Sequence, residues 1–318
     1  MNSMKIICSF DNKYSPYAGV MLASLFENNK DVAITVYALT DYVDDANQQK
    51  FYELANNYKQ QIFFVNIDIN KFRDLPHGGT RFSHIGLGTY YRLLSDVLLP
   101  NDVKKALYLD CDIIVNASLK SLYDIDITDV AVCALYDKPD VSSNYSERLG
   151  YNVNDGYVNA GVLLINLEYW RRMKFSEKAF QFLHTHLDKI VYHDQDVLNA
   201  LLHDKKKVFP LRYNMMECFF MKQPSLHSMY LNQLHDAILH PAIIHFTGTR
   251  KPWHIECNHP YRYLYMKYLA MTPWRGYPLI SRYNSFSEKM KYRIKSLIKL
   301  MLNIAGNGKY TYIKLQTI

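Results

Sequence analysis

The sequence is poor in the residues and runs that mark several classes of protein. Only five cysteines occur among 318 residues, and they form no C-x-x-C pair. An odd, scattered set argues against a disulfide framework or a zinc site and favours free thiols in a reducing compartment. No apolar run approaches the roughly 18 residues that a spanning helix needs. An apolar stretch with a cleavage site is also missing after Met1, so we expect a cytoplasmic protein without a secretion signal.

Positive charge is concentrated near one end of the chain. The formal net charge is +7, and the residues from Ser285 onward, with seven basic side chains and one acidic, contribute +6 of it. The preceding part is therefore nearly neutral, which argues against a nucleic-acid-binding surface. No G-x-G-x-x-G follows the first apolar run, so a nucleotide-dependent redox enzyme is disfavoured.

Short apolar runs alternate with helical segments over most of the chain. This alternation predicts an α/β domain with a mostly parallel central sheet. Ligands of such sheets bind beyond the carboxyl ends of the strands, so polar residues just after a strand are the candidates for a site. The expected strands cover residues 5–10, 32–39, 62–67, 106–109, 130–136, 161–167 and 242–246, and the expected helices cover 15–25, 44–58 and 193–202.

We expect three parts: a main domain over residues 1–271, a linker over 272–284 and a basic amphipathic tail over 285–318. The tail has two helical rows of side chains. Apolar residues recur at three- and four-residue spacing, and a basic row is offset from them. Such a helix binds anionic membrane surfaces, although it can also pack on the protein's own body. The apolar row is Phe286, Met290, Ile294, Leu297, Ile298 and Met301, and the basic row is Lys291, Lys295 and Lys299.

Two carboxylates follow an apolar run in Tyr108-Leu109-Asp110-Cys111-Asp112. In an extended chain, side chains two residues apart point to the same side, so Asp110 and Asp112 can share one hard cation. Oxygen ligands suit Mg²⁺ or Mn²⁺. A solvated strand end with two surface aspartates gives the same short pattern, and the two interpretations are about equally supported.

A longer and more specific string is Ile244-His245-Phe246-Thr247-Gly248-Thr249-Arg250-Lys251-Pro252-Trp253. A histidine that ends an apolar strand is more often a packed core residue than a ligand. Here a glycine that lets the backbone approach an anion and a lysine that can neutralise phosphate follow at fixed spacing. An imidazole as the third ligand would favour Mn²⁺ over Mg²⁺.

Two further segments are polar at the edge of an element. Asn159-Ala160-Gly161 begins an apolar run, where a simple turn is the more common explanation. His193-Asp194-Gln195-Asp196 opens a helix, where acidic residues usually cap the helix and interact with its dipole. Both segments can equally present polar groups to a cleft.

The order of these four motifs resembles glycosyltransferase family 8, which includes bacterial lipooligosaccharide galactosyltransferases and glycogenin. The resemblance covers about Lys5 to His259. It implies a nucleotide-diphosphosugar fold of the GT-A type, a UDP-sugar donor, Mn²⁺ and retention of the anomeric configuration. It further implies transfer of a hexose, galactose or glucose, to a saccharide or lipid-linked acceptor in lipopolysaccharide or other surface-glycan synthesis.

The resemblance also assigns residues to roles. Asp110, Asp112 and His245 match metal ligands, and Gly248 and Lys251 match groups that hold the diphosphate. Uridine contacts match Asp11 and Tyr14, although Ser9 and Phe10 depart from the family's alanine-rich strand end. Groups near the donor sugar match Arg92, Asn159, Asp194 and Gln195, and Asp137 lies where the family often has an acidic residue.

The Gln195 amide oxygen would then face the oxocarbenium-like sugar. An amide is a poor nucleophile, so attack by the acceptor hydroxyl from the face that UDP leaves is favoured over a two-step route through a carboxylate. The glycine-containing segment 77–88 is expected to close over the donor, and 213–225 to contact the acceptor. Two alternatives are a haloacid-dehalogenase-like phosphatase that uses the same pair of aspartates and a membrane-associated, non-enzymatic sugar-binding protein.

Overall fold

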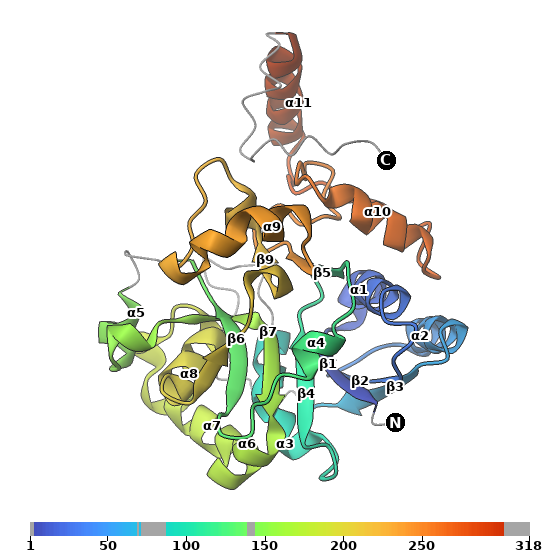
Figure 1. Ribbon diagram of the computed structural model, residues 1–318. Coiled ribbons are helices and arrows are strands. Elements are labelled where there is room, and N and C mark those ends of the chain that lie inside the picture. The colour runs from blue at the N-terminus through green and yellow to red at the C-terminus, as the bar shows by residue number, and fades with distance from the viewer. Residues whose placement is uncertain (1–2, 69, 71–86, 139–143, 302–318) are drawn as a thin grey trace.

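The computed structural model describes residues 3–68, 70, 87–138 and 144–301. Within these residues the strands form a seven-stranded sheet in the order β3-β2-β1-β4-β7-β6-β8 and a three-stranded sheet in the order β5-β10-β9 (Figure 1). The larger sheet consists of β1 (Met4–Ser9), β2 (Ile34–Thr40), β3 (Gln61–Asn66), β4 (Lys105–Leu109), β6 (Val132–Tyr136), β7 (Val158–Asn166) and β8 (Lys206–Val208). The smaller sheet consists of β5 (Ile113–Val115), β9 (Met215–Met216) and β10 (Ile243–His245).

Helices alternate with these strands, so the expected α/β class is confirmed. They are α1 (Ser15–Glu27), α2 (Asp45–Asn57), α3 (Ser95–Leu98), α4 (Lys120–Tyr123), α5 (Tyr145–Leu149), α6 (Leu167–Met173), α7 (Phe175–Thr185), α8 (His193–Leu202), α9 (Leu234–Leu239), α10 (Arg262–Ala270) and α11 (Phe286–Met301). Local signals explain several boundaries. Pro16 lies in the first turn of α1, and the Asp44 side chain caps α2 by accepting from the Asn47 N–H at 2.7 Å.

The direction of β7 determines where the site forms. β1 pairs in parallel with β2 and β4, whereas β7 runs antiparallel to both β4 and β6. The amino end of β7 therefore meets the carboxyl ends of β1, β4 and β6 at one edge of the sheet. Asp110, Asp137 and Asn159 are consequently close together although they belong to three different motifs.

The smaller sheet brings the last motif to the same edge. β10 pairs antiparallel with β5, with His245 opposite Ile113, and the Phe246 N–H donates to the Asp112 carbonyl at 3.0 Å. This pairing sets the histidine at the end of β10 beside the second aspartate, which immediately precedes β5. Two segments far apart in the sequence thus form one side of the site.

The segment expected to be a linker, residues 272–284, contacts the body at several points. Trp274 is buried under α1, where a Cβ on Gly19 would lie 2.5 Å from the indole, and its Nε1 donates to the Asn47 side chain at 2.9 Å. The Ile280 N–H donates to the Trp253 carbonyl at 3.1 Å. The Glu256 carboxylate accepts from the Ser281 hydroxyl and from the Arg282 backbone N–H. The division into domain, linker and tail stays a prediction.

Helix α11 projects away from the rest of the molecule (Figure 1). Among the described residues, none of the helices combines the length and the apolar character that crossing a bilayer requires. The end of the expected tail, 302–318, lies outside the described residues, as does the segment 77–88 apart from Leu87 and Gly88.

Candidate active site

A cavity of about 850 Å³ opens at the edge of the sheet where the motifs meet. All of the residues assigned to a site from the sequence line it, so residues from seven separate parts of the chain are brought together. They are Asp11, Tyr14, Arg92, Asp110, Asp112, Asp137, Asn159, Asp194, Gln195, His245, Gly248 and Lys251. The individual role of each stays a prediction.

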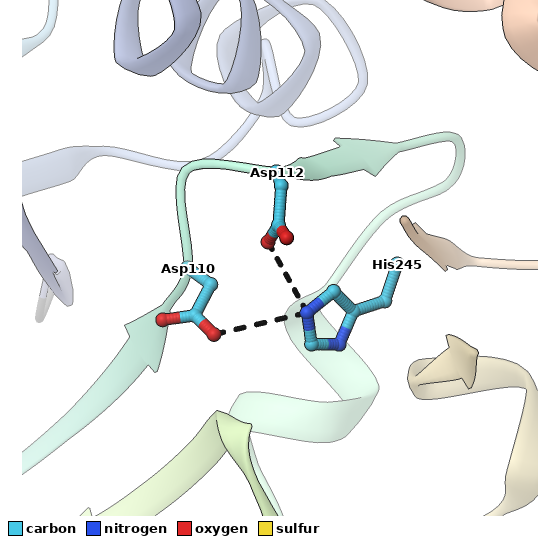
Figure 2. Close-up of side chains that lie close together, drawn as sticks. All are labelled: Asp110, Asp112 and His245. Atoms are coloured by element: carbon cyan, nitrogen blue, oxygen red, sulfur yellow. Dashed lines mark ion pairs between the residues drawn. The ribbon is translucent and has the colours of Figure 1, made fainter. Parts of the chain in front are cut away.

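Asp110, Asp112 and His245 point toward one another (Figure 2), and all three line the cavity. One ligand atom from each lies within 4.8 Å of the others. The His245 Nε2 is 3.7 Å from Asp110 Oδ2 and 3.2 Å from Asp112 Oδ1. Asp112 Oδ1 is buried and accepts no hydrogen bond within the described residues, so it is a candidate oxygen ligand.

Gly161, the last residue of the Asn-Ala-Gly motif, lies very close to two of the candidate ligands. A Cβ at this position would lie 2.2 Å from His245 Cε1 and 2.6 Å from Asp110 Oδ2. These distances are shorter than any real Cβ contact, and the atoms that would be met belong to two of the candidate ligands. The backbone of β7 can approach the three side chains closely only because this residue has no side chain.

Arg92, which also lines the cavity, orients Asp110. Its guanidinium donates to Asp110 Oδ1 at 2.9 Å, and the Tyr108 hydroxyl donates to the same oxygen at 3.0 Å. Both partners occupy one carboxylate oxygen, and the other oxygen is left to face His245. The Arg92 side chain is buried; burial alone would lower its pKa, but Asp110 and Asp194 raise it, so the guanidinium stays charged.

Asp194 lies on the other side of the same guanidinium. Its Oδ2 is 3.0 Å from Arg92 Nε, and its Oδ1 accepts from the Thr89 hydroxyl. Burial raises the pKa of the Asp194 carboxyl to about 6, and Arg92 offsets part of that rise. A buried carboxyl of this kind, held against a cation in a cavity, is a usual feature of functional sites.

Lys251 supplies a second positive charge. Its Nζ lies 2.5 Å from Asp112 Oδ2 and 2.8 Å from the Phe246 carbonyl. Burial would raise the pKa of the Asp112 carboxyl, but the Lys251 ammonium and the His245 ring lower it below its ordinary value. Asp112 is therefore ionised, as a metal ligand must be.

Gly248 lets a neighbouring carboxylate come close. A Cβ at this position would lie 1.3 Å from Glu217 Oε2, so any other residue here would require the Glu217 carboxylate to move. Glu217 also lines the cavity, and its backbone N–H donates to the Thr247 hydroxyl at 3.4 Å. The short loop after β10 is thereby packed against the segment that contains β9.

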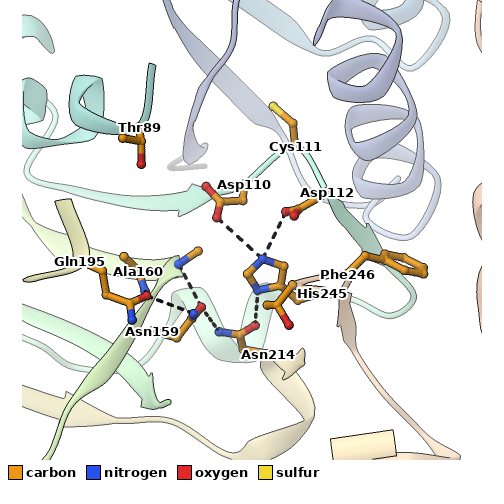
Figure 3. A network of polar contacts seen from close by, with 12 residues as sticks. Thr89, Asp110, Cys111, Asp112, Asn159, Ala160, Gln195, Asn214, His245 and Phe246 are labelled. Atoms are coloured by element: carbon orange, nitrogen blue, oxygen red, sulfur yellow. Dashed lines mark hydrogen bonds and ion pairs between the residues drawn. The ribbon is translucent and has the colours of Figure 1, made fainter. Parts of the chain in front are cut away.

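An amide and carboxylate network formed by Asn159, Gln195 and Asp137 lines part of the cavity, and Figure 3 shows its amide groups. The Gln195 amide nitrogen donates to Asp137 Oδ2 at 2.8 Å, and its Oε1 accepts from the Ala160 N–H at 3.0 Å. The Asn159 amide nitrogen also donates to Gln195 Oε1, at 3.2 Å. These bonds fix the orientation of the Gln195 amide.

The N-cap residue of α8, Tyr192, makes no side-chain cap bond, but Asp196 in the first turn accepts from the Val191 and Tyr192 N–H groups at 2.6 and 2.7 Å. Asp194 and Gln195 face the cavity, whereas Asp196 is fully buried away from it. Asp196 binds the Arg148 guanidinium at 2.7 and 2.9 Å and the Tyr157 hydroxyl at 2.8 Å. Asp196 thus anchors the helix that presents Asp194 and Gln195.

Asp11 and Tyr14 lie at the rim of the cavity, just after β1. The Asp11 carboxylate accepts from the Tyr14 N–H at 2.9 Å, and the Tyr14 ring packs edge-on against Trp253 with centroids 6.0 Å apart. Burial, followed by the charge of Asp112, raises the pKa of the Tyr14 hydroxyl to about 12. This hydroxyl is therefore a neutral hydrogen-bonding group at physiological pH.

Asn214 was not among the residues predicted from the sequence. This residue is fully buried and binds the His245 ring, with 2.9 Å between Asn214 Oδ1 and His245 Nδ1. The available signal was a single polar residue directly before the apolar pair Met215-Met216, in a segment that showed no clear periodicity.

The residues present fit a divalent cation. Two carboxylates and one imidazole converge, one buried carboxylate oxygen lacks a donor, and Gly161 leaves a space that a side chain would fill. A mixed oxygen and nitrogen ligand set suits Mn²⁺ and also accepts Mg²⁺.

A family model described as Glycosyl transferase family 8 matches residues 5–257. The chain belongs to glycosyltransferase family 8. It is 30% identical over 289 residues to General stress protein A of Bacillus subtilis, a match that covers 88% of this chain and 98% of that protein. It is also 30% identical over 312 residues to a lipopolysaccharide 1,2-glucosyltransferase of Escherichia coli, covering 96% of this chain and 88% of that one.

Among solved structures, the galactosyltransferase LgtC in complex with donor and acceptor sugar analogs is similar to this chain. The TM-score is 0.76 at 28% sequence identity, and the match covers 86% of this chain and 99% of that one. The expected GT-A fold of this family 8 glycosyltransferase is thereby confirmed. The comparisons support neither the phosphatase nor the non-enzymatic alternative.

The packing at Gly161 yields a first prediction. Gly161→Ala should weaken binding of Mn²⁺ by about 10- to 100-fold, because the new methyl group displaces His245 or Asp110. The φ of Gly161 is not positive, so alanine strains the contacts and not the backbone. Isothermal titration with Mn²⁺ measures the effect. Gly276→Ala is the matched control, since a Cβ there meets nothing within 4 Å. Equal affinity in both variants would contradict the account.

Proposed function

We propose that this family 8 glycosyltransferase is a retaining, Mn²⁺-dependent hexosyltransferase that moves galactose or glucose from a UDP-sugar to a saccharide or lipid-linked acceptor. The observation that supports it most is the convergence of Asp110, Asp112 and His245 in one cavity with Lys251. Asp110, Asp112 and His245 would hold Mn²⁺, with Mg²⁺ as the alternative cation. A bound divalent cation supplies neutralisation of the diphosphate charge.

The protein's own cations act on the leaving group. Departure of UDP develops negative charge on its β-phosphate, and fixed positive charge at that point lowers the barrier. The Lys251 ammonium is held by Asp112 and by the Phe246 carbonyl, so it is already oriented toward the centre of the cavity. Gly248, with no side chain, would let the loop backbone approach the diphosphate.

The sugar would lie against the amide and carboxylate network. Hydroxyl groups need both donors and acceptors, which Asn159, Asp137 and Asp194 provide, while Arg92 holds Asp194 in place. Gln195 Oε1 would face the developing positive charge of the ring. Because an amide oxygen is a weak nucleophile, we favour attack by the acceptor hydroxyl on the face that UDP leaves.

The uridine would bind at the rim formed by Asp11 and Tyr14. The acceptor would enter from the side of residues 213–225, of which Met216, Glu217, Cys218 and Met221 line the cavity. Relatives named as lipopolysaccharide glucosyltransferase and galactosyltransferase support a role in lipopolysaccharide or other surface-glycan synthesis.

Helix α11 would dock the enzyme on the inner face of an anionic membrane, where lipid-linked acceptors are made. Phe286, Ile294 and Leu297 are 76%, 50% and 53% exposed, so this apolar row does not pack on the described body. Lys291 and Lys295 are exposed beside it. Each basic residue near an anionic surface adds about 1 kcal/mol of attraction, which makes attachment sensitive to salt.

Turnover tests the metal centre. Asp112→Asn and His245→Ala should each reduce release of UDP from UDP-galactose or UDP-glucose by about 100-fold or more, because the diphosphate charge is then poorly neutralised. Far-ultraviolet circular dichroism should show an intact fold. Turnover of the wild type that persists in EDTA would contradict metal dependence.

Stereochemistry tests the mechanism. The product should keep the α configuration of the donor, because the family resemblance implies retention and matches Gln195, an amide and a poor nucleophile, to the position beside the sugar. The anomeric proton coupling in the NMR spectrum of the purified product measures this. A β-linked product from an α-linked donor would show inversion.

Membrane attachment is tested with liposomes. The full chain should co-sediment with vesicles that contain anionic lipid, and attachment should fall with added salt or when the chain is ended at Asn284. Ile294→Ser together with Leu297→Ser removes the apolar contact and leaves the charge in place. Equal binding by the full and shortened chains, or no preference for anionic lipid, would refute this part of the proposal.

A further inference from the structure

Asn214 connects the candidate metal ligand to the sugar side of the cavity. Its side chain is 0% exposed and lies between the turn Leu211–Tyr213 and β9. Its Oδ1 lies 2.9 Å from His245 Nδ1, and its Nδ2 lies 3.0 Å from Asn159 Oδ1 (Figure 3). Asn214 does not itself line the cavity.

Donor and acceptor chemistry fixes the direction of every bond in this chain. The Gly161 N–H can only donate, and it donates to Asn159 Oδ1 at 3.0 Å. The other end of the Asn159 amide faces two acceptors, Gln195 Oε1 and the Asp137 carboxylate. That end must donate, so it is the NH₂ group. Asn159 Oδ1 is therefore an acceptor, and Asn214 must present its own NH₂ group to it.

The orientation of the Asn214 amide determines which nitrogen of the His245 ring carries a proton. With its NH₂ group turned to Asn159, Asn214 presents its carbonyl oxygen to His245 Nδ1, which must then carry a proton. In the neutral ring the lone pair is consequently on Nε2, the nitrogen that lies 3.2 Å from Asp112 Oδ1.

Without this bond the opposite tautomer would be favoured. A proton on Nε2 could be donated to Asp112 Oδ1, an oxygen that has no other donor, and the lone pair would then point away from the candidate metal site. The hydrogen bond to Nδ1 is what makes His245 available as a ligand.

We infer that Asn214 is a positioning residue that holds His245 in the Nδ1–H tautomer for metal binding and ties that ligand, through Asn159, to Gln195 and Asp137. This role of Asn214 rests on the metal site of the proposed function. Two backbone donors determine the direction of the bonds in this network. The Gly161 N–H requires Asn159 Oδ1 to be an acceptor, and the Ala160 N–H requires the same of Gln195 Oε1.

Three variants of the full chain test it. Asn214→Leu removes both bonds at nearly constant volume and should weaken Mn²⁺ binding, measured on the metal alone, by about 10- to 100-fold. Asn214→Asp keeps an acceptor for the Nδ1–H, so its Mn²⁺ affinity should stay within about threefold of the wild type. Its second oxygen faces Asn159 Oδ1, so its KM for the UDP-sugar should rise.

Asn29→Leu is the control for a general packing defect. Asn29 is also fully buried and hydrogen-bonded, to the Leu25 carbonyl and the Leu119 N–H, but it does not line the cavity. This variant should lower the melting temperature and leave Mn²⁺ affinity unchanged. Wild-type Mn²⁺ affinity in Asn214→Leu, or equal losses in Asn214→Asp and Asn214→Leu, would overturn the inference.

A second measurement needs no metal. In ¹⁵N NMR spectra recorded in mildly alkaline buffer, His245 Nδ1 should carry its proton in the wild type and lose it in Asn214→Leu. An unprotonated Nδ1 in the wild type would overturn the inference. Loss of the Nδ1 proton in Asn214→Leu, with no Mn²⁺ binding or turnover in the wild type, would contradict the proposed function and confirm only that Asn214 sets the tautomer.

Discussion

The site depends on the close approach of the Gly161 backbone to two side chains from other strands. The Gly161 carbonyl accepts from the Asp110 N–H at 2.9 Å, and its N–H donates to Asn159 Oδ1 at 3.0 Å. A side chain at this position would occupy the place of the His245 ring. One residue without a Cβ thus lets β7 align the end of β4, the end of β10 and the amide network within one cavity.

Charge balance is the second constraint. Asp110, Asp112 and Asp194 are gathered in a largely buried cavity, and only favourable pairing makes such a cluster tolerable. Arg92 lies between Asp110 and Asp194, and Lys251 pairs with Asp112. These cations leave the inner oxygens of Asp110 and Asp112 directed at His245, which is the arrangement that a divalent cation completes.

Sequence patterns predicted the strands that end at the site, because apolar runs followed by polar residues report burial directly. The helix beginning at His193 was predicted with its observed bounds, and His245 was expected at a strand end. The residues that the family resemblance assigned to roles all line one cavity. Asn214 could not be predicted, because its function lies in a contact between β9 and β10 that pairing alone creates. Likewise, nothing in Trp274's neighbourhood of prolines and glycines indicated that its indole would pack against Gly19.

Asp110, Asp112 and His245 are proposed to form one divalent-cation site beside Lys251. Anomalous diffraction at the manganese absorption edge, from crystals grown with Mn²⁺ and UDP, tests it most directly. The account predicts a single strong peak among the three side chains, with the diphosphate between that peak and Lys251. A structure with UDP in the cavity and no anomalous peak at these residues would contradict it.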